Sequence, residues 1–170
     1  QYHSHVKACE VNWESPTCLT GHVRSNVWVE QDVYFQMQFS RPMTRITALP
    51  LAATEKGQRM LVAFDLKKGE QLEVKIALSS ATIDGACRNM QAELPGWDFE
   101  ATRQKAEDVW SSYLDRIEVE GSDVEKTNFY TCFYHALIQP NNIADVDGTY
   151  RDANGNLAKA EDGTFYSTFS

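Results

Sequence analysis

The hydrophobic period of the sequence changes at Pro95-Gly96, and this change restricts the chain to folds that combine a sheet with helices. Before it, apolar and polar residues alternate, as in 33–39 and 72–78, which is typical of strands with one buried face. After it, apolar residues recur with the 3.6-residue period of a helix. The sequence therefore predicts an α+β fold, with an antiparallel β-sandwich portion followed by helices.

The predicted strands are few for a complete sandwich. Val27, Val29 and the apolar residues of 33–39 lie on one side of alternating segments, and residues 60–64 form a more continuously apolar strand. In 72–78 the apolar residues again occupy one side, the side that we expect to be buried. Residues 67–70 have a turn composition, so we predict a hairpin that joins these last two strands.

Two helices are predicted after the change of period. Asp98 can cap the first helix, whose apolar stripe runs through residues 99–117. Residues 122–125 match the S-x-x-E capping box that begins the second helix, and Pro140 ends it. Aromatic residues occupy nearly all sides of the second helix. We therefore expect it to be buried on more than one face, with Cys132 in the core.

The charge balance argues against two classes of partner. Sixteen Lys and Arg residues against 24 Asp and Glu residues give a net charge of -8. Nucleic acids and anionic membrane surfaces both attract basic proteins. No apolar run approaches the roughly 18 residues that a membrane-spanning helix needs. We expect neither a nucleic-acid partner nor a membrane span.

The four cysteines do not form a metal-binding pattern. They stand at positions 9, 18, 87 and 132 and include no C-x-x-C pair, which argues against a zinc site. Cys9 and Cys18 could close a short loop in an oxidising compartment, or both could be buried free thiols. The sequence leaves these two alternatives open.

The segment Asp145-Val146-Asp147-Gly148 combines carboxylates with a turn residue. Its spacing does not fit an EF-hand loop, because the glycine follows the second Asp directly and Asn156 stands at the twelfth position. Two interpretations remain: turn-forming side chains, or carboxylates that contact sugar hydroxyls. No pair of carboxylates in the chain is marked out as an acid and a base, so the residues alone do not reveal a reaction.

Six segments in order resemble glycoside hydrolase family 92, the calcium-dependent, exo-acting α-mannosidases. They are LTGHVRSN at 19–26, VYFQMQFS at 33–40, PGWDF at 95–99, FYTCFYH at 129–135, DVDGTYR at 145–151 and YSTFS at 166–170. No single segment is decisive, but their order over nearly the whole chain is specific.

The resemblance implies a division into three parts. Residues 1–96 correspond to the C-terminal part of an N-terminal β-sandwich domain, 97–121 to a helical linker, and 122–170 to the start of an (α/α)6 toroid, the catalytic domain. The chain ends in an aromatic and hydroxyl-rich run without a polar tail. We therefore expect it to be a fragment that continues beyond Ser170.

The resemblance also implies an activity: hydrolysis of terminal α-linked mannose of glycans, with inversion and with calcium. In such a reaction one carboxylic acid protonates the leaving oxygen and a carboxylate activates water from the opposite face. Both carboxylates and the calcium ligands are expected beyond Ser170. No catalytic residue or metal ligand is therefore assigned here, and we predict that the isolated fragment is inactive.

Substrate contacts, partners and compartment follow from the same resemblance. The implied partners are mannose-containing glycans and the remainder of the enzyme, in the periplasm or outside the cell. Tyr166, Ser167, Phe169 and Ser170 are expected beside the mannose pocket, and Asp145, Asp147 and Tyr150 at its rim.

A different class of function stays open beside the enzyme. The chain could be a non-catalytic β-rich module that binds carbohydrate or a partner protein. The aromatic pairs Trp97/Phe99 and Tyr166/Phe169 would then serve as stacking platforms. A toroidal enzyme for another sugar, such as a glucosidase, is the third alternative.

Overall fold

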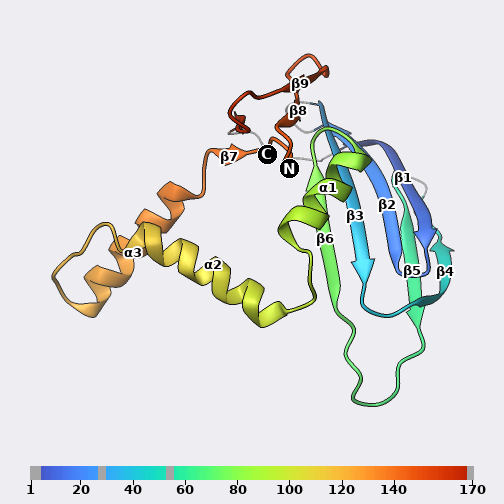
Figure 1. Cartoon of the computed structure of the whole chain (residues 1–170), viewed down its shortest axis with the longest axis horizontal. Helices are drawn as coiled ribbons and strands as arrows, with labels where there is room; N and C mark the ends of the chain where they lie inside the picture. The colour runs from blue at the N-terminus through green and yellow to red at the C-terminus, as the bar shows by residue number, and fades with distance from the viewer. Residues whose placement is uncertain (1–4, 27–29, 53–55, 168–170) are drawn as a thin grey trace. The chain divides into compact units, whose positions relative to one another are not determined.

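The computed structural model describes residues 5–26, 30–52 and 56–167, and the chain divides into two units (Figure 1). The first, here called the sandwich unit, comprises Gln1–Pro95 and Ile143–Phe165. The second, the helical unit, comprises Gly96–Asn142 and Tyr166–Ser170. The chain thus leaves the sandwich unit once and returns to it for 23 residues, counted from 143 through 165.

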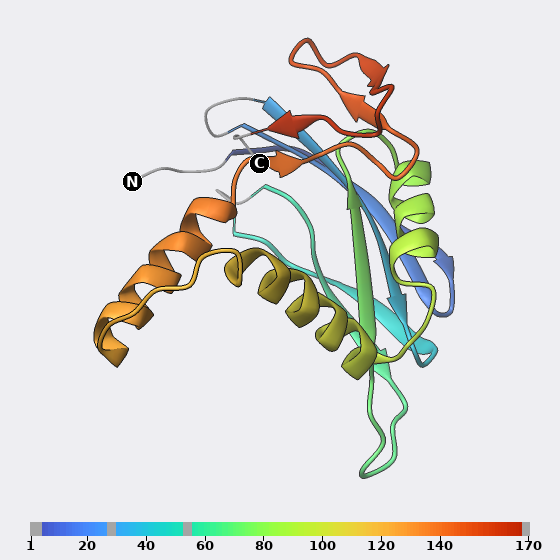
Figure 2. The same cartoon turned by 60° about the vertical axis from the view of Figure 1, so that its left-hand side comes forward.

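A four-stranded antiparallel sheet forms the centre of the sandwich unit. Its order is β1-β2-β3-β6, and its strands are β1 (His5–Ser15), β2 (Cys18–Asn26), β3 (Glu30–Phe39) and β6 (Val74–Ser79). A hairpin of β4 (Met43–Leu49) and β5 (Arg59–Phe64) packs on one face, and helix α1 (Ile83–Glu93) packs on the other (Figure 2). Leu19, Phe39 and Met43 are the buried residues between the sheet and the hairpin. The predicted α+β class, with a sandwich portion before helices, is confirmed.

The apolar side of β6 is more exposed than the sequence predicts. Val74, Ile76 and Leu78 are 47–58% exposed, whereas Ala77 and Ser79 on the opposite side are buried. The reason is that α1 covers the face with the small side chains. On the opposite face of the sheet, the β4–β5 hairpin packs against Leu19 and Phe39.

The predicted hairpin between residues 60–64 and 72–78 is wrong. Both strands form, but β5 pairs with β4 and β6 pairs with β3, in different sheets. The turn itself is present: the Glu70 N–H donates to the Lys67 carbonyl at 3.0 Å, and Gly69 has a φ of +91°. A turn signal fixes local chain reversal and leaves the choice of strand partner to tertiary packing.

In the helical unit, the predicted caps are confirmed. Asp98 accepts a hydrogen bond from the Ala101 N–H at the start of α2 (Phe99–Leu114). Ser122 forms the predicted capping box at the start of α3 (Asp123–Leu137). The rings of Trp110 and Tyr134 lie 4.6 Å apart between the two helices.

The expected burial of α3 is wrong for this chain. No residue of α3 is buried, and Cys132 is exposed. Within the described part of the helical unit, α3 packs against α2, and its Tyr130 hydroxyl donates to the Ile117 carbonyl just after α2. One neighbouring helix covers one side of α3 only.

The last segment contains two short antiparallel pairs. They are β7 (Asn141–Asn142) with β10 (Tyr166–Ser167), and β8 (Thr149–Arg151) with β9 (Leu157–Lys159). Gly155, at the turn between β8 and β9, has a φ of +83°, as the Asn154-Gly155 dipeptide predicts. The first pair lies in the helical unit and the second in the sandwich unit.

None of the described helices is long and apolar enough to cross a membrane.

The four cysteines are free thiols. In the β1–β2 hairpin Cys9 lies opposite Val23, whereas Cys18 lies opposite Ser15. The two thiols are therefore at different levels of one hairpin. The disulfide alternative is not formed.

Candidate functional site

Asp145 is buried in the sandwich unit and is held by α1 and β6. It is 2% exposed. Its Oδ2 accepts from the Ser79 hydroxyl at 2.8 Å, and its Oδ1 accepts from the Asn89 amide at 2.9 Å. A Cβ at Gly85 would clash with this carboxylate and would lie 2.6 Å from Ser79 Oγ. Both carboxylate oxygens are thus engaged inside the protein, and the glycine leaves room for them.

The segment after Asp145 is a tight turn. This agrees with the interpretation of Asp145 to Gly148 as turn-forming residues. The Gly148 N–H donates to the Asp145 carbonyl at 2.7 Å, and Gly148 has a φ of +81°. The Thr149 N–H donates to Asp147 Oδ1 at 3.1 Å, and hydrogen bonding by Thr149 lowers the pKa of Asp147. Arg88 of α1 lies 3.2 Å from the other oxygen of Asp147.

Arg151 fastens the same segment to the sheet at a second point. Its guanidinium donates to the carbonyls of Ala81 at 2.6 Å and Ser80 at 3.3 Å, and to the Tyr34 hydroxyl at 3.2 Å. A third nitrogen donates to the Gly155 carbonyl at 2.7 Å, within the β8–β9 hairpin. One side chain therefore joins the hairpin to β3 and to the loop after β6.

Asp32 places a negative charge beside this guanidinium. It lies 3.8 Å from Arg151 Nε, and Arg24 binds both of its oxygens at 2.8 and 2.9 Å. His22 Nε2 lies 2.5 Å from Oδ1, and the His22 ring stacks on Tyr34 at 4.4 Å. The hydrogen bonds from Arg24 are the main reason that the pKa of Asp32 is lowered, so the carboxylate stays charged in mild acid.

The predicted substrate residues are divided between the two units. Asp145, Asp147 and Tyr150 lie in the sandwich unit, where the Tyr150 ring stacks on Phe165 at 3.8 Å. Tyr166, which is 61% exposed, and the half-buried Ser167 lie in the helical unit. The remaining two, Phe169 and Ser170, lie outside the described residues.

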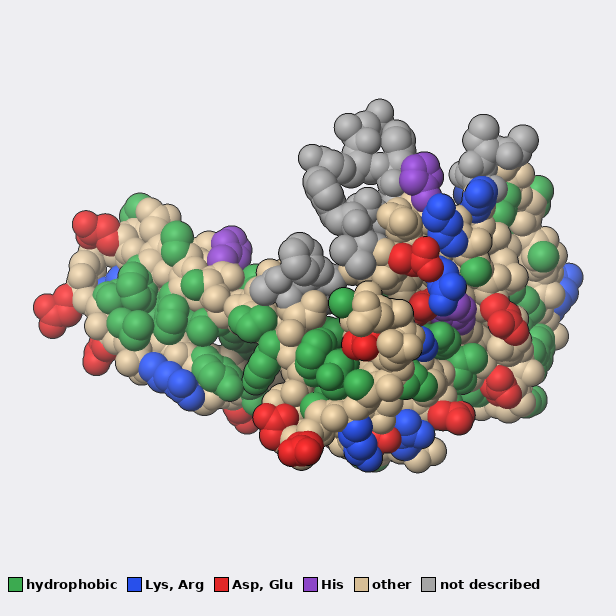
Figure 3. All heavy atoms as spheres, turned by 90° about the horizontal axis from the view of Figure 1, so that it is seen from above, with side chains coloured by type: hydrophobic (Ala, Val, Ile, Leu, Met, Phe, Trp, Pro, Cys, Tyr) green, Lys and Arg blue, Asp and Glu red, His purple; other side chains and the backbone are tan. Residues whose placement is uncertain are grey.

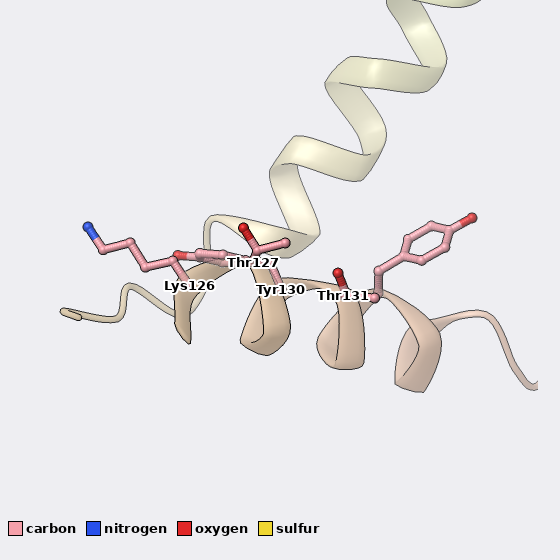
Figure 4. A pocket seen from close by; sticks show the side chains of 5 residues that line it. Lys126, Thr127, Tyr130 and Thr131 are labelled. Carbon is pink, nitrogen blue, oxygen red and sulfur yellow. The ribbon is translucent and has the colours of Figure 1, made fainter. Parts of the chain in front are cut away.

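A shallow hollow of about 460 Å³ lies over α3 (Figure 4). All of its lining residues come from that helix: Lys126, Thr127, Tyr130, Thr131 and Tyr134. No carboxylate is among these lining residues. Acidic, basic and histidine side chains are interspersed on the face drawn in Figure 3, without a basic stripe.

Metal-ligating side chains do not cluster in the described part of the chain. No group of three or more His, Cys, Asp or Glu side chains that could hold a metal ion occurs within residues 5–26, 30–52 and 56–167. The oxygens of Asp145 face hydrogen-bond donors, which is the wrong complement for a cation ligand.

Comparison with known proteins decides the family. The model of the glycosyl hydrolase family 92 catalytic domain matches residues 85–170, just over half of the chain. The chain belongs to glycosyl hydrolase family 92. The match begins within α1, so the family's catalytic domain includes α1 and the returning segment 143–165, which both fold into the sandwich unit here.

Solved members of family 92 share this fold. An α-mannosidase from Bacteroides thetaiotaomicron, BT3965, is 29% identical and superposes with a TM-score of 0.81, over 93% of this chain and 24% of that one. The inverting mannosidase BT2199 from the same bacterium is 23% identical, with a TM-score of 0.77 over 94% of this chain and 24% of that one.

A curated relative extends the comparison to fungi. An uncharacterized secreted glycosidase of Arthroderma benhamiae is 33% identical over 75 residues, which are 41% of this chain and 10% of that protein. The chain thus spans about a quarter of the solved structures and a tenth of the fungal relative.

The family motifs contain a group of residues that the sequence analysis did not single out as a cluster. His22 and Arg24 belong to the 19–26 segment, and Tyr34 to the 33–40 segment. The signal was available, because His22 and Arg24 are two residues apart on a strand and share a face. Their partner Asp32 is visible only once the β2–β3 register, Arg24 opposite Asp32, is known.

Proposed function

We propose that the whole protein is an exo-acting α-mannosidase that hydrolyses terminal α-linked mannose of glycans. The observation that carries the proposal is the similarity to BT3965, a family 92 α-mannosidase, over 93% of this chain at 29% identity. That enzyme has also been solved in complex with mannoimidazole. Mannose-containing glycans and the remainder of the enzyme are the proposed partners.

The proposed reaction inverts the anomeric carbon and requires calcium. Inversion needs a carboxylic acid and a carboxylate on opposite faces of the sugar, about 6.5–9.5 Å apart, so that a water molecule fits between them. The described residues contain no group of three or more His, Cys, Asp or Glu side chains that could hold a metal ion, and the chain spans only 24% of BT3965. We propose that both carboxylates and the calcium ligands lie in the part of the enzyme outside this chain.

Two roles are proposed for the predicted substrate residues. Tyr166 is exposed and aromatic, which suits contact with a sugar ring; Ser167, Phe169 and Ser170 are proposed beside it. Asp147 and Tyr150 are proposed at the rim of the pocket. For Asp145, a direct sugar contact would require its bonds to Ser79 and Asn89 to break, so its contribution to the rim is made through the turn that it holds.

The compartment is proposed from the fungal relative, which is named as secreted. We propose that the protein acts in the periplasm or outside the cell. Fractionation of the native source, with activity measured in each fraction, tests this. Activity confined to the cytoplasm would contradict it.

The central experiment is mannose release by the full-length protein. We expect hydrolysis of α-linked mannosides, β-mannose as the first product in a proton NMR time course, and loss of activity with a chelator that calcium restores. The matched α-glucoside should not be cleaved, and residues 1–170 alone should release no mannose.

Other outcomes would select the alternatives. Cleavage of the glucoside alone would favour the alternative that the protein is a toroidal enzyme for another sugar, such as a glucosidase. Glycan binding without hydrolysis, retained by residues 1–170 alone, would favour a non-catalytic binding module. The exposed rings of Phe99 and Tyr166 are the stacking surfaces that such a module would use.

A further inference from the structure

Residues 143–165, here called the strap, return from the helical unit to the sandwich unit and then leave it again. The Ile143 N–H donates to the Phe165 carbonyl at 2.9 Å and closes the base of the strap. The next residues outward, Asn142 and Tyr166, are opposite each other in the β7–β10 pair. Tyr166 and Ser167 therefore follow the base of the strap directly in the chain.

The strap has internal bonds that shape it without the sheet. The Asp152 carbonyl accepts from the Gly155 N–H at 3.0 Å, and the Gly148 carbonyl accepts from the Ala160 N–H at 2.8 Å. Together with the β8–β9 pairing, these bonds define a small hairpin. They do not determine where that hairpin lies on the sandwich unit.

Asp145 and Arg151 contribute several bonds each to the attachment of the strap, beside the 3.2 Å contact of Asp147 with Arg88 and the Val146 N–H, which donates to Asn89 Oδ1 at 2.9 Å. Asp145 is buried against Ser79 and Asn89. Arg151 reaches two backbone carbonyls after β6, the Tyr34 hydroxyl and the charge of Asp32. Asp145 lies four residues before β8 and Arg151 is the last residue of β8, so the strap is attached at two separate points. A fixed guanidinium fork bonded to several acceptors permits little movement.

We propose that Arg151 and Asp145 are positioning residues of the glycosidase. They hold the strap on the sandwich unit and thereby fix the point from which the chain enters Tyr166 and Ser167, the residues proposed to contact mannose. The inference rests on the proposed function. It gives the sandwich unit a part in catalysis: it is the base to which a segment of the catalytic domain is fastened.

The kinetic test uses Arg151→Gln and Arg151→Lys in the full-length enzyme. Displacement of a substrate residue by about 1 Å can reduce turnover roughly 100-fold. We expect Arg151→Gln to reduce kcat/KM by about 10- to 100-fold with a raised KM, and Arg151→Lys to recover part of the loss because it keeps the charge beside Asp32. Arg103→Gln, an exposed arginine of α2, is the matched control and should change kcat/KM less than twofold.

The KM separates positioning from mere loss of folded enzyme. A smaller folded fraction lowers the apparent kcat and leaves KM unchanged, so a normal KM in Arg151→Gln would overturn the proposal. Limited proteolysis within 143–165 tests the attachment without any activity: cleavage should be faster in Arg151→Gln than in Arg103→Gln. Equal cleavage would show that Arg151 does not hold the strap.

This pair of readouts distinguishes the two proposals. If the unmodified full-length protein hydrolyses no mannoside, the proposed function fails, and the positioning role fails with it. Faster cleavage in Arg151→Gln would then still establish the attachment itself.

Discussion

The sandwich unit and the helical unit are held together in different ways. Every buried residue among those described belongs to the sandwich unit, and most of the buried ones lie between the sheet and its two covering layers. In the helical unit the described contacts are mainly local: two N-caps and, on α2, the exposed pairs of Arg103 with Glu100 and Glu107. Local bonds of this kind form helices but contribute little to tertiary stability.

The difference explains where the strap belongs. It follows α3 directly in the chain, yet it folds with the sandwich unit, because its buried carboxylate finds donors on α1 and β6. The apolar side chains of the helical unit are largely exposed, as the green surface over α2 and α3 in Figure 3 shows. Exposed apolar surface of this extent marks a contact surface. Changes in the sandwich unit should therefore have large effects, and changes in the helical unit small ones.

The largest effect is expected from Asp145→Ala in the full-length protein. The substitution leaves the Ser79 hydroxyl and one Asn89 N–H bond without a carboxylate acceptor in a buried site. We expect a loss of about 3 kcal/mol in the free energy of unfolding of the sandwich unit, measured by urea denaturation. Asp65→Ala, at an exposed position, is the control and should cost less than about 0.5 kcal/mol. Equal midpoints for the two variants would contradict the buried anchor.

An intermediate effect on the stability of the sandwich unit is expected when the pH is lowered. The pKa of Asp32 is lower in the folded protein than its ordinary value, chiefly through hydrogen bonds from Arg24 and also through His22. A lowered folded pKa gives stability that is present above the unfolded pKa of about 3.9 and is lost as pH falls below it. The urea midpoint of the sandwich unit should therefore decrease below about pH 4.

The neighbours of Asp32 define the control for this titration. The charged and titratable side chains around Asp32 are Arg24, Arg151, His22 and Glu30, and the last of these lies 3.5 Å from Arg24. In Asp32→Asn the decrease should be smaller, because the group that titrates has been removed. An identical pH profile in the two proteins would mean that Asp32 contributes nothing to acid sensitivity.

The smallest effect is expected from Ser122→Ala in the helical unit. Loss of an N-cap side chain costs about 1 kcal/mol of helix stability. Amide hydrogen exchange should be about fivefold faster in α3 and unchanged in β6 and α1. Faster exchange in the sandwich unit would contradict the claim that changes in the helical unit have only local effects.

The sequence predicted local structure well and long-range partners poorly. The caps at Asp98 and Ser122 and the turns at Gly148 and Gly155 depend on residues within four positions of each other, so the sequence contains the whole cause. Helix α1 was not predicted, because its buried face consists of small and polar residues, Gly85, Ala86 and Asn89, apart from Met90. A signal was present, because Thr82 caps the helix through the Gly85 N–H and the four buried residues fall on one face.

The site was harder to predict for the same reason. Asp145 was singled out for the chemistry of its carboxylate, whereas its partners lie 56 and 66 residues away in the chain. Arg151 lies 117 residues from Tyr34. Such contacts depend on topology, and no local pattern contains them. The assignment of mannose contacts to residues 166–170 stays a prediction.

Hydrogen exchange of the native full-length protein in increasing denaturant tests the central claim most directly. If the strap is fastened to the sandwich unit, the amides of Asp145, Gly148 and Ala160 will open together with those of α1 and β6, at the same free energy and denaturant dependence. If they instead open with α3, their neighbour in sequence, the strap belongs to the helical unit and the positioning role of Arg151 and Asp145 is contradicted.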